Sequence, residues 1–213
     1  MTLEPRLPWL IAHLGAPHTC WSWAVVNGGC AVTDTVAWLF LEVDELRGCA
    51  DARGFLQARM TAAGLATAAG MMTTRRPAWV RAMASHGALS CDAIVTVGLS
   101  NALRAGDPPG EARCSTINTL VRISTPLSES AALEALCLAA SARTAAMLES
   151  GTVSRVSGRG ATGTGTDCIV LASPCGEPEA PYAGMHTAIG SVIGRAVLDA
   201  TAHGIREWTE ENA

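Results

Sequence analysis

The 213-residue chain carries few charges for its size: 16% of its residues are charged, 49% are hydrophobic, and the mean hydropathy is +0.25. This composition predicts large buried elements, or an interface between copies of the chain that hides further apolar surface. All fifteen basic residues are arginines and the formal net charge is −4, which excludes a lysine Schiff base, a phosphate-loop lysine and a serine–lysine dyad, and leaves no basic stripe for nucleic acid.

Residues 8–14 and 21–26 are apolar runs typical of strands, and the second leads into Asn27-Gly28-Gly29, a strong hairpin signal. Residues 33–43 carry apolar side chains at consecutive positions, so their periodicity permits either a strand or a buried helix. Residues 51–63 predict a helix that an aspartate caps at its first position.

The rest of the chain contains the clearest elements. Strands are predicted at 92–99, 115–123 and 168–173, and long amphipathic helices at 128–149 and 187–208. Strands dominate the first two thirds, and the two helices bracket the final strand. The sequence therefore predicts a single α+β domain, with a largely antiparallel or mixed β-sheet backed by two long C-terminal helices.

The predicted strand at 115–123 mixes polar and apolar side chains. Successive side chains of a strand point to opposite faces of its sheet. Thr116 and Asn118 are therefore expected on one face, with Ile117 and Thr119 on the other.

A glycine-rich loop, Gly-Arg-Gly-Ala-Thr-Gly-Thr-Gly-Thr-Asp at residues 158–167, precedes the last predicted strand. Glycines let successive backbone N–H groups face one way and form an anion or oxyanion site. The hydroxyls of Thr162, Thr164 and Thr166 would lie on one side of an extended backbone. Two alternatives are a flexible hairpin loop and a phosphate cradle in a nucleotide-handling enzyme; the absent lysine and the missing strand–loop–helix order disfavour the latter.

The cysteines give no metal or redox signal. They stand at positions 20, 30, 49, 91, 114, 137, 168 and 175, no two form a Cys-x-x-Cys pair, and most lie in apolar runs. We expect buried, reduced thiols and neither a metal nor another cofactor. A metal-assisted hydrolase is a weaker alternative, because His13, His18 and Cys20 lack a further ligand at the usual spacing.

No apolar run appears long enough in the sequence to cross a membrane, and Leu7–Leu14 makes a poor signal peptide because Pro8 and His13 interrupt it. We therefore expect a cytoplasmic protein with neither a membrane nor a nucleic acid as its partner.

The sequence contains, in this order, the segments Val97–Ala102 with Arg104–Asp107, Ser115–Thr119, Ala161–Asp167 and Tyr182–Thr187. Together these four segments resemble the adenosylcobinamide amidohydrolase (CbiZ) family. The resemblance implies one domain over residues 1–213, with about 1–25 outside the similar region. It also implies hydrolysis of the amide between the corrin ring and the aminopropanol arm of adenosylcobinamide, giving adenosylcobyric acid for cobalamin salvage. The family pattern has glycine at Ser115, an acidic residue near Ser141 and threonine at Met185.

Amide hydrolysis needs a nucleophile, a proton shuttle and stabilisation of the oxyanion. Among the matched residues, His186 is the expected shuttle, and Asp167 is expected to orient it, to activate a water or to cap the turn. The nucleophile is the hydroxyl of Thr166 or Thr164, or a water that attacks directly. The N–H groups of Gly163 and Gly165 are expected to bind the oxyanion. This mechanism requires His186 and Asp167 to converge on one pocket.

Further polar residues are expected to bind the substrate. Asn101, Asn118 and Thr119 carry groups that bond the carboxamides of a corrin ring, and Thr164 is expected beside them. Tryptophans and methionines offer a stacking surface, with Trp79 as a candidate for its rim. The expected partner is thus a small corrinoid, with homo-oligomers possible. The alternative from another class is a corrinoid-binding protein without activity.

Overall fold

The computed structural model describes residues 1–46, 48–110 and 115–213, which form a mixed eight-stranded sheet, a two-stranded ribbon and three α-helices. The predicted single α+β domain with two long C-terminal helices is confirmed. The helices are α1 (Ala52–Ala62), α2 (Glu129–Glu149) and α3 (Ala188–Glu211), with a 3₁₀ turn η1 (Val43–Leu46) before α1. The strands are β1 (Thr2–Arg6), β2 (Trp9–Ser22), β3 (Gly29–Phe40), β4 (Ala69–Thr73), β5 (Val80–His86), β6 (Leu89–Val97), β7 (Ala102–Leu103), β8 (Ile117–Ile123), β9 (Gly163–Thr164) and β10 (Cys168–Pro174).

The large sheet has the strand order β4-β3-β2-β10-β8-β6-β5, and β1 pairs with the first half of β2. Strands β3 and β4 are parallel, as are β8 and β10, whereas the other neighbours are antiparallel. The parallel pairing of β8 and β10 brings the beginnings of these two strands side by side, with Cys168 opposite Asn118.

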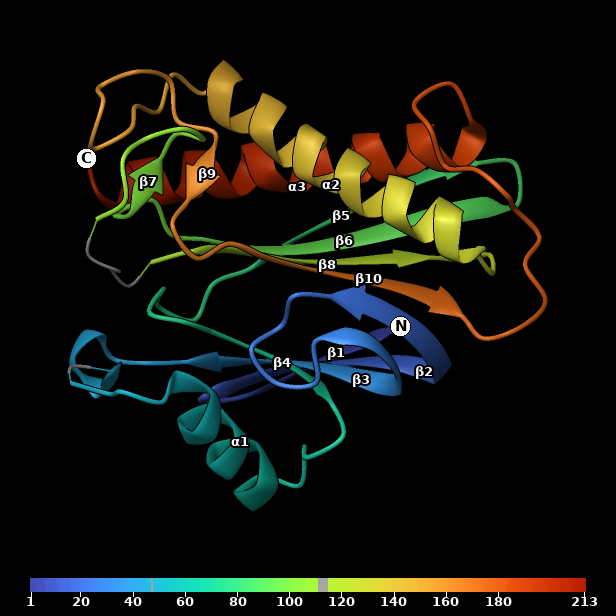
Figure 1. Cartoon of the computed structure of the whole chain (residues 1–213), viewed down its shortest axis with the longest axis horizontal. Coiled ribbons are helices and arrows are strands. Elements are labelled where there is room, and N and C mark those ends of the chain that lie inside the picture. The colour runs from blue at the N-terminus through green and yellow to red at the C-terminus, as the bar shows by residue number, and fades with distance from the viewer. Residues whose placement is uncertain (47, 111–114) are drawn as a thin grey trace.

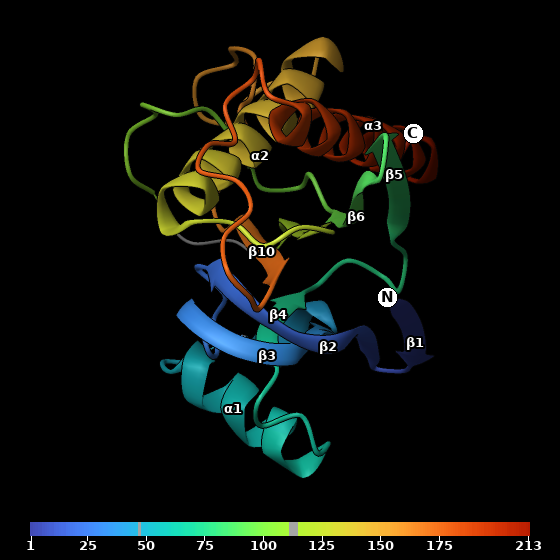
Figure 2. The same ribbon diagram turned by 90° about the vertical axis from the view of Figure 1, so that its right-hand side faces the viewer.

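The two halves of the sheet stack on each other. Helices α2 and α3 cover the half made of β5, β6, β8 and β10, and α1 lies below the half made of β1 to β4 (Figures 1 and 2). Neighbouring residues of one strand therefore reach different cores: Val95 packs under α2 and α3, and Ile94 packs between the sheet halves. In β3, Trp38 lies in that middle core, and Leu39 packs towards α1.

This double burial explains where the strand predictions succeeded. Residues 33–43 lack polar alternation because β3 is buried on both faces along its second half, and they form a strand rather than a helix. The prediction of separate strands at 8–14 and 21–26 is wrong, because β2 is one strand from Trp9 to Ser22 with an irregularity between His13 and His18. Of residues 23–26, all of which the structure describes, only Val26 pairs, in an isolated bridge with Gly70.

Local signals placed the turn and the helix starts. Asn27 adopts a φ of 55°, which fits the predicted turn. Each helix begins at a side-chain cap: Asp51 accepts from the Gly54 N–H, Ser128 accepts from the Ala131 N–H, and Thr187 accepts from the Gly190 N–H.

Helix α2 is, by length and composition, apolar enough to cross a membrane, with a mean hydropathy of 1.4. The expectation that no segment has this character is wrong. Its buried positions are mainly alanines, which let the helix approach α3 and β10 closely. In this fold α2 is a core helix of the domain.

Two glycines of α3 make a matched test of this packing. A Cβ at Gly190 would overlap the backbone carbonyl of Gly184, whereas a Cβ at Gly194 meets no atom within 4 Å. We expect Gly190→Ala to lower the free energy of unfolding by about 1–3 kcal/mol. Gly194→Ala is expected to leave it unchanged or raise it by up to about 1 kcal/mol. Urea unfolding measures both, and equal effects of the two variants would contradict the packing described.

Candidate functional site

The carboxylate of Asp167 joins the glycine–threonine loop to β8 and α2. Its Oδ1 accepts from the Ile117 N–H at 3.1 Å and from the Thr164 hydroxyl, and its Oδ2 accepts from the Thr164 N–H at 3.0 Å. The Arg143 guanidinium lies 3.1 Å from Oδ2, and both side chains are largely buried, at 13% and 7% exposure. Asp167 is therefore the anion that this loop binds, and its oxygens are occupied by the protein's own donors.

The glycines of the loop allow this close packing. A Cβ at Gly163 would overlap the Asp167 carboxylate, so only glycine at this position leaves room for that carboxylate. A Cβ at Gly165 would lie 2.8 Å from the Asn101 side-chain nitrogen, and the Gly165 N–H donates to the Asn101 carbonyl oxygen at 3.3 Å. Because that N–H already has an acceptor, the predicted oxyanion role of Gly165 does not fit this structure.

A cleft of about 640 Å³ opens where β8 and β10 begin. One wall is polar and includes Thr116, Asn118, Thr166 and Asp167. The indole N–H of Trp23 donates to the Asp167 carbonyl oxygen at 2.5 Å, which fixes the indole at the edge of this wall. Apolar side chains complete the lining, namely Val25, Leu46, Met71 and Met72. The cleft therefore pairs hydrogen-bonding groups with an apolar surface, the usual character of a small-molecule site.

Thr116 is the buried hydroxyl of this cleft. Its Oγ1 donates to the Thr166 carbonyl oxygen at 2.8 Å, so its lone pairs remain available to a ligand. The residue before it, Ser115, has a φ of 102°, a backbone region that costs free energy for any residue but glycine. The Ser100 N–H donates to the Ser115 hydroxyl at 3.1 Å and holds it in this conformation. Strain of this kind, at a cleft wall, marks Thr116 as a functional candidate.

Thr166 and Asn118 both line the cleft, though in different ways. Thr166 is exposed, and its hydroxyl has no hydrogen-bond partner among the residues that the structure describes. Asn118 is buried, and its side-chain nitrogen donates to the Met72 carbonyl oxygen at 2.9 Å. The first is free to bind a ligand, whereas the second mainly ties β8 to β4.

The expected convergence of His186 and Asp167 is not found. Asp167 directly precedes β10, and His186 follows the loop that leaves the other end of this strand (Figure 1). A seven-residue strand separates its ends by about 20 Å. The sequence contained no information on the direction of β10 relative to the start of α3, so a proton relay between these two side chains does not fit this structure.

Two further predicted residues lie outside the cleft. Thr119 is on the opposite face of β8 from Thr116 and Asn118, as the alternation predicted, and it is fully buried beneath the helices. It therefore cannot contact a ligand in the cleft. Asn101 is buried beside a second cavity, of about 710 Å³, which the Gly165–Thr166 turn separates from the cleft.

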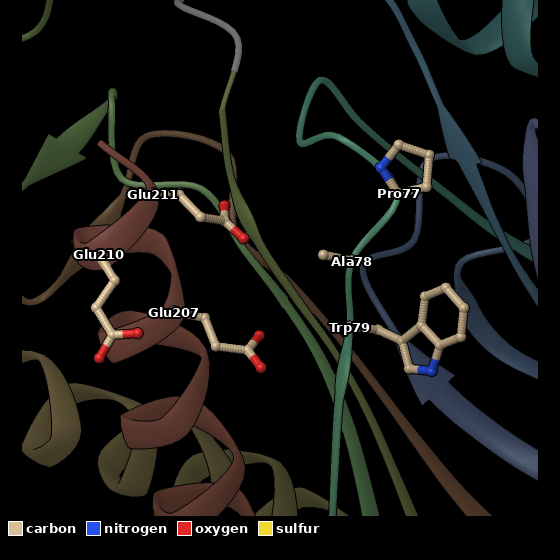
Figure 3. Close-up of a pocket in the computed structure, with 6 residues that line it drawn as sticks. All are labelled: Pro77, Ala78, Trp79, Glu207, Glu210 and Glu211. Carbon is tan, nitrogen blue, oxygen red and sulfur yellow. The ribbon is translucent and has the colours of Figure 1, made fainter. Parts of the chain in front are cut away.

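A third hollow, of about 470 Å³, lies beside Trp79 at the C-terminal end of α3 (Figure 3). Three carboxylates line it, those of Glu207, Glu210 and Glu211, and the indole points away from them. The ring packs against the core between the sheet halves instead. Trp79 is therefore not a rim residue of the cleft.

Two cysteines line the cleft, the half-buried Cys49 and the buried Cys168, and the thiol of Cys168 is a poor nucleophile. Burial raises the pKa of Cys168 to about 12, so almost none of it is thiolate near neutral pH. Of the seven described cysteines, all unpaired, Cys20, Cys91 and Cys168 are buried, but Cys30, Cys137 and Cys175 are exposed, contrary to the general expectation of burial; Cys114 lies outside the described residues. Within residues 1–46, 48–110 and 115–213, no group of three or more His, Cys, Asp or Glu side chains is arranged to hold a metal ion.

Sequence reasoning missed Thr116, Arg143 and Trp23. A signal existed for Thr116, because it shares a strand face with Asn118 and stands inside a motif of the family resemblance. Arg143 lies within a predicted helix, and nothing in its spacing links it to Asp167, 24 positions away. These contacts depend on how α2 is placed over β10.

The Arg143–Asp167 pair predicts a stability effect. We expect Arg143→Ala to lower the free energy of unfolding by about 3 kcal/mol, because it leaves a buried carboxylate without its cation. Arg195→Ala is the control, because its pair with Asp199 is exposed and contributes about 0.5 kcal/mol or less. Urea denaturation compares them, and an Arg143 variant as stable as the control would show that the pair does not hold the site together.

The family model described as adenosylcobinamide amidohydrolase (CbiZ) matches residues 2–213, so it also includes the first 25 residues, which the sequence resemblance left out. A search of curated proteins found no match. Three solved structures are distantly similar over most of the chain. The PH0078 protein from Pyrococcus horikoshii OT3 aligns with a TM-score of 0.46 and 11% identity, covering 97% of this chain and 79% of that one.

The other two are aminopeptidases. The Burkholderia sp. beta-aminopeptidase has a TM-score of 0.42 and 15% identity, with 92% and 78% of the two chains covered. The L-aminopeptidase D-Ala-esterase/amidase from Ochrobactrum anthropi, whose structure is a new variant among the Ntn hydrolase fold, has a TM-score of 0.43 and 12% identity, with 96% and 82% of the two chains covered. Because the family model spans nearly every residue, the chain belongs to the adenosylcobinamide amidohydrolase (CbiZ) family and is an amide hydrolase.

Proposed function

We propose that the protein hydrolyses the amide between the corrin ring and the aminopropanol arm of adenosylcobinamide, giving adenosylcobyric acid for cobalamin salvage in the cytoplasm. One observation carries the proposal beside the family match. Two of the four motifs, residues 115–119 and 161–167, are remote in sequence, and together they form the polar wall of one cleft.

The apolar part of the cleft suits a macrocycle. Trp23 and Met72 offer flat and adaptable surface to the corrin face, and the hydroxyls of the polar wall are available to an amide at the periphery of the ring. This replaces Trp79 as the stacking candidate. A bound corrin ring would also account for the open side of the cleft, because the ring is too large for a cavity of about 640 Å³ to enclose it.

In the proposed reaction a water attacks the amide directly. Its oxygen adds to the carbonyl carbon, the C–N bond breaks, and the products are a carboxylate and a protonated amine. The hydroxyls of Thr116 and Thr166 orient this water and the amide. The N–H group of Thr166 has no acceptor among the described residues, so we assign it, in place of Gly163 and Gly165, to the oxyanion. Asp167 itself holds the loop in shape.

The activity is tested with adenosylcobinamide and the purified protein. We expect mass spectrometry to detect adenosylcobyric acid together with free aminopropanol. A corrinoid that binds, as followed by its absorbance, and stays intact at every pH and with every added metal would support the non-catalytic alternative instead.

Variants locate the reaction within the fold. We expect Thr116→Val and Thr166→Val each to lower kcat/KM by at least about tenfold, the effect of losing one hydrogen bond to the reacting groups. His186→Ala is expected to stay within about twofold of the wild type, because its side chain lies at the opposite end of β10. A His186 variant as impaired as the threonine variants would move the site to the other end of the sheet. Circular dichroism confirms that each variant is folded.

A further inference from the structure

The cavity on the far side of the Gly165–Thr166 turn differs in character from the cleft. It measures about 710 Å³, and the turn lines both hollows. The cleft is largely apolar around Trp23, whereas two arginines, Arg104 and Arg155, line the second cavity. A substrate with its scissile bond at the turn would thus place its two halves in different surroundings.

The two guanidinium groups are held differently. Arg104 donates from Nη1 to the Gly160 carbonyl oxygen at 2.7 Å, which fixes the direction of its side chain. Arg155 is tied only through its backbone, whose N–H donates to the Ala102 carbonyl oxygen at 3.0 Å. Its exposed guanidinium has no partner among the described residues. One arginine of the cavity is therefore anchored, and the other is available to a ligand.

Asp107 is the acidic side chain in the lining of this cavity. Its Oδ2 accepts from the Ser154 hydroxyl at 2.5 Å and from the Arg104 N–H at 2.8 Å. Hydrogen bonds from Ser154 and Ser157, and then from the Arg104 backbone, lower the pKa of this carboxyl. Asp107 thus remains an anion engaged with its own loop. Among the described residues that line the cavity, two cations stand against one anion, which is a net positive charge.

We propose that this cavity binds the leaving arm of the substrate, and that Arg155, with Arg104, recognises an anionic group on it, a phosphate ester on the arm's hydroxyl. The inference rests on the proposed function, because it requires the scissile amide to lie at Thr166. The cavity is far larger than an aminopropanol arm needs, so it has room for a further group on the arm. An arginine guanidinium binds two oxygens of a phosphate at once through two parallel N–H donors.

The test compares adenosylcobinamide with its phosphate ester as substrates of the whole protein. We expect kcat/KM for the phosphate ester to be at least about tenfold higher than for adenosylcobinamide. This is the effect on binding expected from one hydrogen bond between oppositely charged groups. Arg155→Gln is expected to abolish this preference, by lowering kcat/KM for the ester at least about tenfold relative to that for adenosylcobinamide. Arg206→Gln, which removes an exposed arginine of α3 outside both hollows, is expected to keep it.

Three outcomes separate this inference from the proposed function. Equal kcat/KM for the two corrinoids, or a preference that persists in Arg155→Gln, overturns it. If neither corrinoid is hydrolysed, the proposed function fails, and the ratio of the two Kd values from absorbance titration decides the inference in the same variants. Inorganic phosphate is the second probe, expected to inhibit hydrolysis of the ester in the wild type and not in Arg155→Gln.

Discussion

The carboxylate of Asp167 is the interaction on which the site depends. It draws together three parts of the chain that are remote in sequence: the start of β8 through the Ile117 N–H, the loop through Thr164, and α2 through Arg143. A buried ion is costly unless other groups compensate for its lost hydration, and four donors do so here. The same charge that makes the carboxylate expensive to bury therefore fixes the relative positions of a helix, a strand and a loop.

This arrangement changes what Asp167 contributes to chemistry. A carboxylate whose oxygens already accept from two N–H groups, a hydroxyl and a guanidinium has little capacity left to accept a further hydrogen bond from a water or a ligand. Its effect is on its neighbours. The Trp23 indole and the Thr116 hydroxyl bond to the carbonyl oxygens of Asp167 and Thr166, so the loop that Asp167 shapes in turn sets the cleft wall.

The sequence predicted the features that depend on neighbouring residues, and it mispredicted a contact that depends on the direction of a strand. Helix caps at Asp51, Ser128 and Thr187 are local, and so is the alternation that separated Thr116 from Thr119. His186 was misplaced because periodicity reports which face a residue occupies and not which end of the sheet its strand reaches. The stacking of the two sheet halves was equally invisible, since a strand buried on both sides loses the pattern that would identify its faces.

The turn at Gly165–Thr166 shows why so short a segment can serve an amphipathic substrate. Gly165 packs against the Asn101 side chain, so the ridge between the two hollows is only a backbone wide, and Thr166 lines both of them. A corrinoid has a large, mostly apolar ring on one side of the amide and a small polar arm on the other. A thin ridge with an apolar cleft on one side and a cationic cavity on the other matches that division, and it places the exposed hydroxyl of Thr166 at the boundary, where the proposed reaction breaks the bond.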